Sequence, residues 1–278
     1  MTLYQPESLD AALALLARGA GPVLAGGTDL YPGLRDAPAP ARMVDITRIA
    51  GLRGIICEDA VWNIGAATTW SDLLRADLPP LFDGLKAAAR EVGAVQVQNA
   101  GTLAGNLCNA SPAADGVPAL QALEAEVAIS GPQGRRVLAL DAFISGPRRT
   151  ALAPGELVTG IRVPDRPGRG SFVKLGARRY LVISIVMVGA YVEMREGRVL
   201  HAAVSVGACA PVARRLPELE AALIGQSPDA VERLVQDAPL DGFAPIDDIR
   251  ATSAYRMDAV RTLVAQALSK SMEAGDVA

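Results

Sequence analysis

The sequence predicts an α+β protein with two domains, on the basis of three observations. Short apolar runs typical of strands alternate with stretches in which leucines recur at helical spacing. Residues 126–130 with 135–138, and 185–194 with 199–206, are pairs of apolar runs joined by short Gly-containing turns, which favours antiparallel hairpins. Residues 166–170, of sequence RPGRG, have the composition of a linker between a longer N-terminal part and a C-terminal part.

The N-terminal part is predicted to begin with a helix. Ser8 is its predicted N-cap, Leu9, Leu13 and Leu16 recur along one face, and Gly19 ends it. Strands are predicted at 23–25, 43–46, 61–66, 126–130, 135–138 and 157–163, and helices from 69 or 71 to 74, over 81–90, and from 117 onward.

The C-terminal part has a simpler pattern. Strands are predicted at 172–175, 185–194 and 199–206, and helices near 216–223, 229–237 and 255–268. A small antiparallel sheet backed by helices is the simplest arrangement of these elements.

Residues 23–30 combine the end of a strand, a tight bend and the start of a helix. Gly26 and Gly27 let main-chain N–H groups approach a ligand that a Cβ would hold away, and Thr28 and Asp29 are suitable first residues of the helix. A helix start adds unpaired N–H donors and the positive end of a dipole. The motif predicts an anion-binding turn, although an ordinary strand-turn-helix corner has the same pattern.

A second glycine-bearing stretch, residues 96–115, is rich in small residues and amides and nearly free of charge. Its backbone donors, hydroxyls and three Asn amides suit a loop that wraps closely around a polyhydroxylated, phosphate-bearing molecule. Asp115 is its one formal charge. It can accept hydrogen bonds from ribose or ribityl hydroxyls, its alternative role is to cap the helix that follows, and both roles can hold together.

Three segments, AGGTDL at 25–30, NAGTLAGN at 99–106 and ASPAAD at 110–115, resemble the FAD-binding medium subunit of the molybdenum hydroxylases. That family includes carbon monoxide dehydrogenase and xanthine dehydrogenase. The resemblance continues through residues 174–184, 206–211 and 245–256. It implies a FAD-binding domain of the PCMH or vanillyl-alcohol-oxidase type over residues 1–166, with two subdomains split near 54, and a C-terminal domain of antiparallel sheet and helices over 171–278.

The resemblance also implies a set of FAD-binding residues. Residues 25–29 and 102–106 would hold the pyrophosphate through main-chain N–H groups, Asp115 would bind hydroxyls of the FAD chain, and Lys174 would approach the isoalloxazine, where an ammonium stabilises negative charge. Lys174 paired with a local acid is the alternative. The full set is Leu24, Ala25, Gly26, Gly27, Thr28, Asp29, Leu30, Thr102, Leu103, Ala104, Gly105, Asn106, Asn109, Asp115, Lys174, and Val158 or Ile161 against the adenine or flavin.

The chain departs from the family pattern in two places. Ala104 stands where relatives often have Gly, which is tolerable if φ is negative there, and Ala100 stands where relatives often have Arg. The tip at residues 178–180, with Tyr180, is either a solvated turn or, by resemblance, a loop that reaches the flavin. Cys108 lies inside the second glycine stretch and is expected as a small buried apolar residue, with a flavin link or redox role as the alternative.

The implied function is electron transfer through FAD. Electrons would come from a molybdopterin centre on a large partner subunit through two [2Fe–2S] clusters on a small partner, in a dimer of heterotrimers, and would leave to NAD⁺, a quinone or dioxygen. No catalytic or metal-binding residue is assigned to this chain itself. A self-sufficient FAD-dependent reductase and a nucleotide-binding module without redox activity are the alternatives.

Composition excludes several other classes. The net charge of −3 gives no electrostatic reason to expect nucleic acid as a partner. The longest apolar run, 181–192, is too short to span a membrane, and without a secretory signal pattern the chain is expected in the cytoplasm. Three dispersed cysteines do not fit an iron–sulfur or zinc site, and the single histidine, His201, is expected as a partly exposed strand residue.

Overall fold

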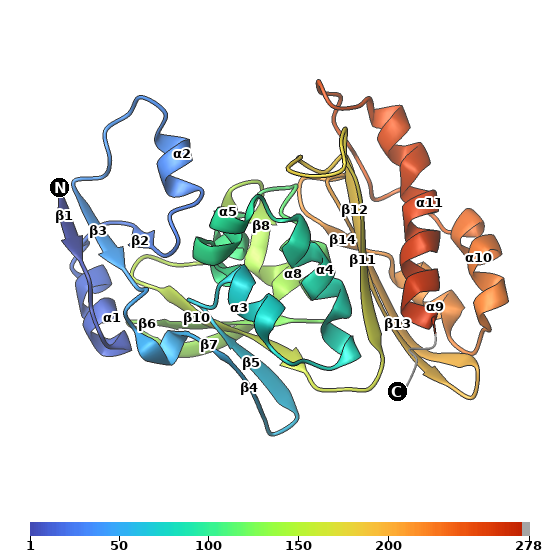
Figure 1. Cartoon of the computed structure of the whole chain (residues 1–278), viewed down its shortest axis with the longest axis horizontal. Coiled ribbons are helices and arrows are strands. Elements are labelled where there is room, and N and C mark those ends of the chain that lie inside the picture. Colours follow the sequence, from blue (N-terminus) through green and yellow to red (C-terminus); the bar gives the residue numbers. More distant parts are fainter. Residues whose placement is uncertain (274–278) are drawn as a thin grey trace. The chain divides into compact units, whose positions relative to one another are not determined.

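The structure, a computed structural model, describes residues 1–273 and divides into two compact units. Unit 1 comprises residues 1–76, 92–110 and 125–165. Unit 2 comprises residues 77–91 and 111–124 together with the chain from Arg166 onward. Two segments from within the predicted FAD-binding region therefore pack with the C-terminal part (Figure 1).

The first sheet of unit 1 is small and parallel. Its strands are β1 (Thr2–Tyr4), β3 (Arg42–Asp45) and β2 (Val23–Leu24), in that spatial order. Helix α1 (Leu9–Ala17) packs beside it and begins as predicted, because the Ser8 hydroxyl accepts a hydrogen bond from the Ala11 N–H. The short helix α2 (Leu30–Leu34) follows β2 directly after the two glycines.

The second sheet of unit 1 is antiparallel and has five strands. They are β4 (Ile55–Glu58), β5 (Val61–Gly65), β10 (Leu157–Pro164), β6 (Glu126–Gly131) and β7 (Gly134–Ala139), in that spatial order. The other helices and strands of unit 1 are η1 (Ala50–Leu52), α3 (Trp70–Arg75), α5 (Val95–Ala100), α6 (Leu103–Asn109), α8 (Leu140–Phe143), β8 (Ile144–Gly146) and β9 (Arg149–Thr150).

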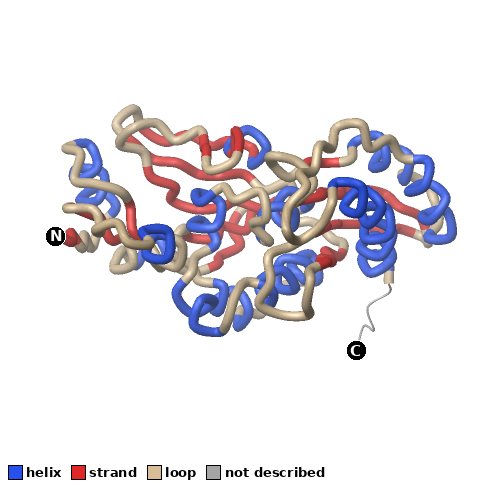
Figure 2. The backbone as a smooth tube through the Cα atoms, turned by 90° about the horizontal axis from the view of Figure 1, so that it is seen from above, coloured by secondary structure: helices blue, strands red, loops and turns tan. Residues whose placement is uncertain are grey.

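Unit 2 is built on an antiparallel sheet of β11 (Arg169–Leu175), β12 (Val186–Arg195), β13 (Arg198–Gly207) and β14 (Arg214–Arg215). Its helices are η2 (Pro80–Phe82), α4 (Asp83–Glu91), α7 (Gly116–Ala122), α9 (Pro217–Leu223), η3 (Pro228–Ala230), α10 (Val231–Asp237) and α11 (Ser253–Met272). Figure 1 shows α4 and α11 on opposite sides of this sheet, and Figure 2 shows its strands in red between blue helices.

Strand β12 is covered on both faces, which explains its uninterrupted apolar sequence. Val188, Ala190 and Val192 belong to the core shared with α11. On the opposite face, a Cβ on Gly189 would meet the main chain of Pro118 in α7 at 2.5 Å. A strand covered on two sides loses the apolar-polar alternation of a half-exposed strand.

Most predicted elements are confirmed, and the exceptions are local. Residues 95–109, predicted as a loop, form the short helices α5 and α6. Strands β1, β4, β8, β9 and β14 and helix α8 were not predicted. The linker is shorter than expected because β11 already begins at Arg169. No helix in residues 1–273 is long and apolar enough to cross a membrane.

Candidate functional site

The glycine turn of unit 1, residues 25–29, presents a row of free main-chain donors. Within residues 1–273, none of its N–H groups donates to a protein acceptor, whereas the Gly27 and Asp29 carbonyls accept from the N–H groups of Tyr31 and Gly33 in α2. Residues 25–28 are half-buried. Consecutive N–H groups without acceptors form an anion-binding concavity, so the turn has the donors that a diphosphate needs.

The second predicted stretch supplies fewer donors. Thr102 caps α6 by accepting the Gly105 N–H at 3.0 Å, and the Leu103 and Asn106 N–H groups bind the carbonyls of Thr68 and Thr102. The Ala104 N–H has no protein acceptor in the described part of the chain. The Asn106 Oδ1 atom is buried without a hydrogen-bond partner, which is costly unless a ligand or water donates to it.

The two stretches lie against each other. An ideal Cβ on Gly26 would stand 1.9 Å from the carbonyl oxygen of Ala100, so the two main chains are in direct contact. The Asn109 side-chain amide donates to the Asp29 carboxylate at 2.8 Å, and Arg148 in turn donates to Asn109. The free N–H groups, the orphan acceptor on Asn106 and this close approach fit the phosphates and hydroxyls of a dinucleotide.

Gly27 was expected to let main-chain N–H groups approach a ligand, but the structure gives a different reason for a glycine at this position. Its φ is +69°, and an ideal Cβ would stand 2.7 Å from the ring of Tyr31. The space beside Gly27 is therefore filled by Tyr31, and its backbone conformation also favours glycine. Ala104 is tolerated as predicted, because it lies in α6 and is not among the residues with positive φ.

Unit 2 brings together two residues that were each predicted to bind FAD, Asp115 and Lys174, and adds Ser184. The structure therefore has the local acid partner of Lys174 that was the alternative to its place at the isoalloxazine. Lys174 Nζ lies 2.8 Å from Asp115 Oδ2, and the Ser184 hydroxyl donates to Asp115 Oδ1 at 2.7 Å. The side chains of Lys174 and Asp115 are only 6% and 10% exposed. Ser184 ends the 174–184 segment of the family resemblance and is the one serine in the apolar run 181–192, but neither feature indicates its bond to Asp115.

The surroundings of Asp115 have two effects on its pKa. Burial raises the pKa of Asp115, and the Lys174 ammonium and the Ser184 hydroxyl oppose that rise. Asp115 is also the N-cap residue of α7, but its side chain forms no capping hydrogen bond. The side-chain cap, which was the alternative role of Asp115, is therefore not formed, and the carboxylate accepts hydrogen bonds from Lys174 and Ser184.

The structure gives the position and the exposure of the remaining predicted residues. Val158 and Ile161 are 3% and 0% exposed, so unliganded protein already covers both side chains. Leu24 and Leu103 are buried, Leu30 is half-buried, and Cys108 on α6 is exposed. Tyr180 is 60% exposed, with Arg179 stacked on its ring. Their roles toward FAD remain predictions.

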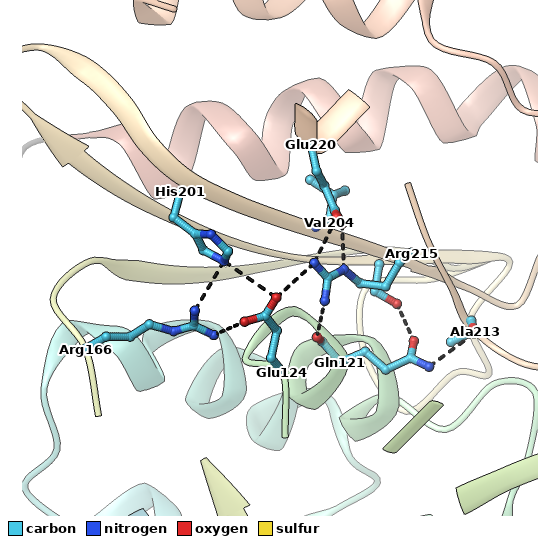
Figure 3. A network of polar contacts seen from close by, with 9 residues as sticks. Gln121, Glu124, Arg166, His201, Val204, Ala213, Arg215 and Glu220 are labelled. Atoms are coloured by element: carbon cyan, nitrogen blue, oxygen red, sulfur yellow. Dashed lines mark hydrogen bonds and ion pairs between the residues drawn. The ribbon is translucent and has the colours of Figure 1, made fainter. Parts of the chain in front are cut away.

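His201 belongs to a charge network in unit 2 that the sequence did not predict (Figure 3). Its Nε2 lies 3.2 Å from Arg166 and 3.6 Å from Glu124. Glu124 also pairs with Arg166 and, at 3.3 Å, with Arg215. The predicted strand position and partial exposure of His201 are confirmed. Arg166 lies 35 positions from His201 and 42 from Glu124 in the sequence, and no local pattern reveals such contacts.

The chain matches two family models and several curated relatives. The FAD binding domain in molybdopterin dehydrogenase matches residues 1–166, and the CO dehydrogenase flavoprotein C-terminal domain matches residues 171–271. The carbon monoxide dehydrogenase medium chain of Hydrogenophaga pseudoflava is 32% identical over 96% of this chain and 95% of its own length. The xanthine dehydrogenase FAD-binding subunit of Escherichia coli O157:H7 is 29% identical over 98% and 96%.

Solved structures give the same relationship. Carbon monoxide dehydrogenase from Hydrogenophaga pseudoflava superposes with a TM-score of 0.88 at 30% identity, covering 98% of this chain and 96% of that chain. The match includes both units, so the resemblance inferred from the motifs is confirmed along the chain. With a glycine turn whose N–H groups are free for a diphosphate and with both parts matched, this chain belongs to the FAD-binding medium subunits of the molybdenum hydroxylases, a family of oxidoreductases.

Proposed function

We propose that this chain is the FAD-carrying electron-transfer subunit of a heteromeric molybdenum hydroxylase. It accepts electrons from [2Fe–2S] clusters of a small partner subunit and passes them to NAD⁺, a quinone or dioxygen. A large partner subunit carries the molybdopterin centre at which substrate is oxidised. The complex is a dimer of heterotrimers.

The single observation that carries this proposal is the row of free N–H groups at residues 25–29. These donors hold the diphosphate of FAD, and the Ala104 N–H adds one more from α6. The orphan Asn106 Oδ1 accepts from a hydroxyl of the cofactor chain. When bound, FAD supplies the redox chemistry, and the chain contributes binding and orientation.

Lys174 and Asp115 are two further residues that we assign to FAD. We assign Lys174 to the isoalloxazine, where its ammonium favours the negatively charged state, and Asp115 to the hydroxyls of the FAD chain and to holding Lys174 in place at 2.8 Å. The Ser184 hydroxyl fixes the other oxygen of Asp115. Val158 or Ile161 packs beside the adenine or flavin.

The substrate is set by the partner subunits. Relatives that are 27–32% identical to this chain are named for complexes acting on nicotinate, carbon monoxide, glyceraldehyde and nicotine. Similar flavin subunits therefore serve different substrates, which fits a chain that handles electrons after the substrate chemistry.

Copurification of the chain with its partner subunits, followed by reaction with substrate, tests this proposal. The chain is coexpressed with large and small subunits of the family. The isolated chain and the complex are each incubated with FAD, freed of unbound FAD and mixed with the substrate of the complex. We expect flavin absorbance in both samples and substrate-dependent bleaching only in the complex. Bleaching in the isolated chain favours a self-sufficient reductase, and failure to bind FAD in either sample leaves only a nucleotide-binding module.

A further inference from the structure

Arg256 is a buried arginine near the start of α11, in the last segment of the family resemblance, 245–256. It is only 3% exposed, so its charge needs partners inside the protein. One partner is the carboxylate of Asp248, 2.8 Å away. The others are main-chain carbonyls, which accept hydrogen bonds from the Nη1 atom of Arg256: Ile185 at 2.6 Å and, with a longer bond, Ala208 at 3.4 Å. Asp248 balances the charge, whereas the two carbonyls join α11 to two distant segments of the chain.

The carbonyl of Ile185 lies where an exposed loop returns to the core of unit 2. Residues 177–181, between β11 and β12, are exposed, and the chain is buried again from Ser184 onward. The Ile185 N–H donates to the Leu175 carbonyl at 2.8 Å, so both main-chain groups of Ile185 are bound. Ser184 precedes Ile185, and Lys174 precedes Leu175. The anchored pair therefore lies one residue from each of them in the chain.

The carbonyl of Ala208 connects Arg256 with Asp115. Ala208 directly follows β13, and its φ of +64° is rare for a residue other than glycine, so its contacts hold it in that conformation. Its N–H donates to the carbonyl of Pro112 at 3.0 Å. Pro112 and Asp115 belong to one short segment, 110–115. Both main-chain groups of Ala208 are therefore bound, one to Arg256 and the other three residues before Asp115.

Lys174, Asp115 and Ser184 are joined by hydrogen bonds of 2.8 Å and 2.7 Å, and we call them the lysine cluster. Lys174 and Ser184 each lie one residue, and Asp115 three residues, from a main-chain group that is bound in the way described above. A guanidinium suits this arrangement, because its donors form a rigid planar fork that reaches several acceptors at once. Without Arg256, the segments that carry the lysine cluster lose a common anchor.

We propose that Arg256 is a positioning residue for FAD. It fixes the main chain on both sides of the lysine cluster, and so keeps the Lys174 ammonium against Asp115 in the arrangement that meets the isoalloxazine. This inference rests on the proposed function, which assigns Lys174 and Asp115 to the cofactor. It adds a residue of α11 that acts on FAD through the main chain of other segments.

Acetylation of lysine side chains tests the positioning without FAD. The chain has only three lysines, Lys86, Lys174 and Lys270, so Lys86 and Lys270 serve as internal references. The FAD-free full chain is treated with acetic anhydride for increasing times, and mass spectrometry follows each site. Lys174 should react slowly, because its side chain is 6% exposed and its ammonium is paired. Arg256→Met should raise the rate at Lys174, relative to Lys86 and Lys270, at least tenfold.

Arg261 supplies the matched control on the same helix. Its Nη1 atom also donates to two main-chain carbonyls, those of Val235 and Ala238, but these lie at the end of α10 and not beside the lysine cluster. Arg261→Met should leave the relative rate at Lys174 within twofold, and denaturant unfolding of both variants separates this effect from a loss of global stability. An unchanged rate in Arg256→Met, or an equal rise in both variants, overturns the inference.

Arg256→Lys keeps the test decisive if Arg256→Met does not fold. A lysine retains a positive charge beside Asp248 but lacks the planar fork of the guanidinium. The folded Arg256→Lys variant should therefore still be acetylated faster at Lys174 than the unchanged chain. An equal rate in the two proteins overturns the inference.

The midpoint potential of bound FAD separates this inference from the proposed function. Lys174→Met should lower the ratio of the affinities for reduced and oxidised FAD, and Arg256→Met should lower it at least tenfold, a fall of about 30 mV for a two-electron couple. Arg261→Met should leave the potential unchanged. A fall with Lys174→Met but not with Arg256→Met overturns the inference and leaves the proposed function intact. If the unchanged chain does not bind FAD, the proposed function is wrong, whereas the acetylation rates still decide whether Arg256 holds the lysine cluster.

Discussion

The ammonium of Lys174 lies 2.8 Å from the carboxylate of Asp115, and both side chains are almost fully covered. The two residues are 59 positions apart and come from the N-terminus of α7 and from β11. Removing one partner of a buried ion pair lowers the free energy of unfolding, because the other charge then stays buried away from water without an opposite charge beside it.

A double-mutant cycle measures this pair. Lys174→Met should lower the free energy of unfolding of the FAD-free chain by about 3–5 kcal/mol, and Asp115→Asn should have a cost of similar size. The double variant should be more stable than the sum of the two losses predicts, because neither charge is then left alone. Denaturant unfolding of the four proteins checks this, and additive losses would show that the two groups do not interact.

Ser184 should matter through Asp115. Ser184→Ala removes the donor to Asp115 Oδ1 and should destabilise the chain by about 1–3 kcal/mol. The pKa of Asp115, already raised by burial, should rise further. A carboxyl whose pKa is raised in the folded state loses stability as pH rises above its unfolded pKa.

The loss caused by Ser184→Ala should therefore be larger at pH 7 than at pH 4. Thermal unfolding at both pH values checks this, with Ser184→Thr as the variant that keeps a hydroxyl. A loss independent of pH would indicate a packing defect and not a lost hydrogen bond to Asp115.

The ionised carboxylate of Asp248 stabilises unit 2, and this stabilisation is lost in acid. Hydrogen bonds from the main-chain N–H groups of Arg250 and Ala251 and from the side chains of Arg250 and Arg256 lower the pKa of Asp248 to about 2. Because this carboxyl has a lower pKa in the folded state, its stabilisation is present above pH 3.8, its ordinary value, and is lost as pH falls towards 2.

Between pH 4 and pH 2, the free energy of unfolding should therefore fall less in Asp248→Asn than in the unchanged protein. The protein should also be less stable at pH 7, because Arg256, which is 3% exposed, loses its ionised partner. Circular dichroism during acid titration of both proteins measures this. An unchanged acid transition in the variant would show that other carboxyls govern acid unfolding.

Local chemistry predicted many of these elements. Ser8, Gly19 and the turn at residues 195–198 act as expected, with Glu196 and Gly197 at φ +53° and +73°, as a tight hairpin turn requires. The AGGTDL segment forms the predicted strand end, turn and helix start, whereas its role toward FAD stays a prediction. Such features depend on a few adjacent residues.

Features that depend on distant residues were not predictable. Helix α6 has Gly and Asn within it and low intrinsic helix propensity, yet Leu103 and Leu107 are fully buried and stabilise it through packing. The contact of Gly26 with Ala100 and the bond of Ser184 with Asp115 join residues 74 and 69 positions apart. No periodicity encodes such pairs. The family resemblance named Asp115 and Lys174 as residues toward FAD but did not indicate their contact with each other.

The affinity for FAD of two alanine variants tests the central claim most directly. Gly26→Ala forces a methyl group to within 1.9 Å of the Ala100 carbonyl, so the turn must move and its N–H groups lose their alignment. Gly33→Ala, a few residues along in α2, meets nothing within 4 Å and is the matched control. Titration of the FAD-free proteins with FAD, followed by flavin fluorescence, should give a Kd at least a hundredfold higher for Gly26→Ala and an unchanged Kd for Gly33→Ala. Equal FAD affinity in a folded Gly26→Ala variant would contradict the assignment of this turn to the cofactor diphosphate.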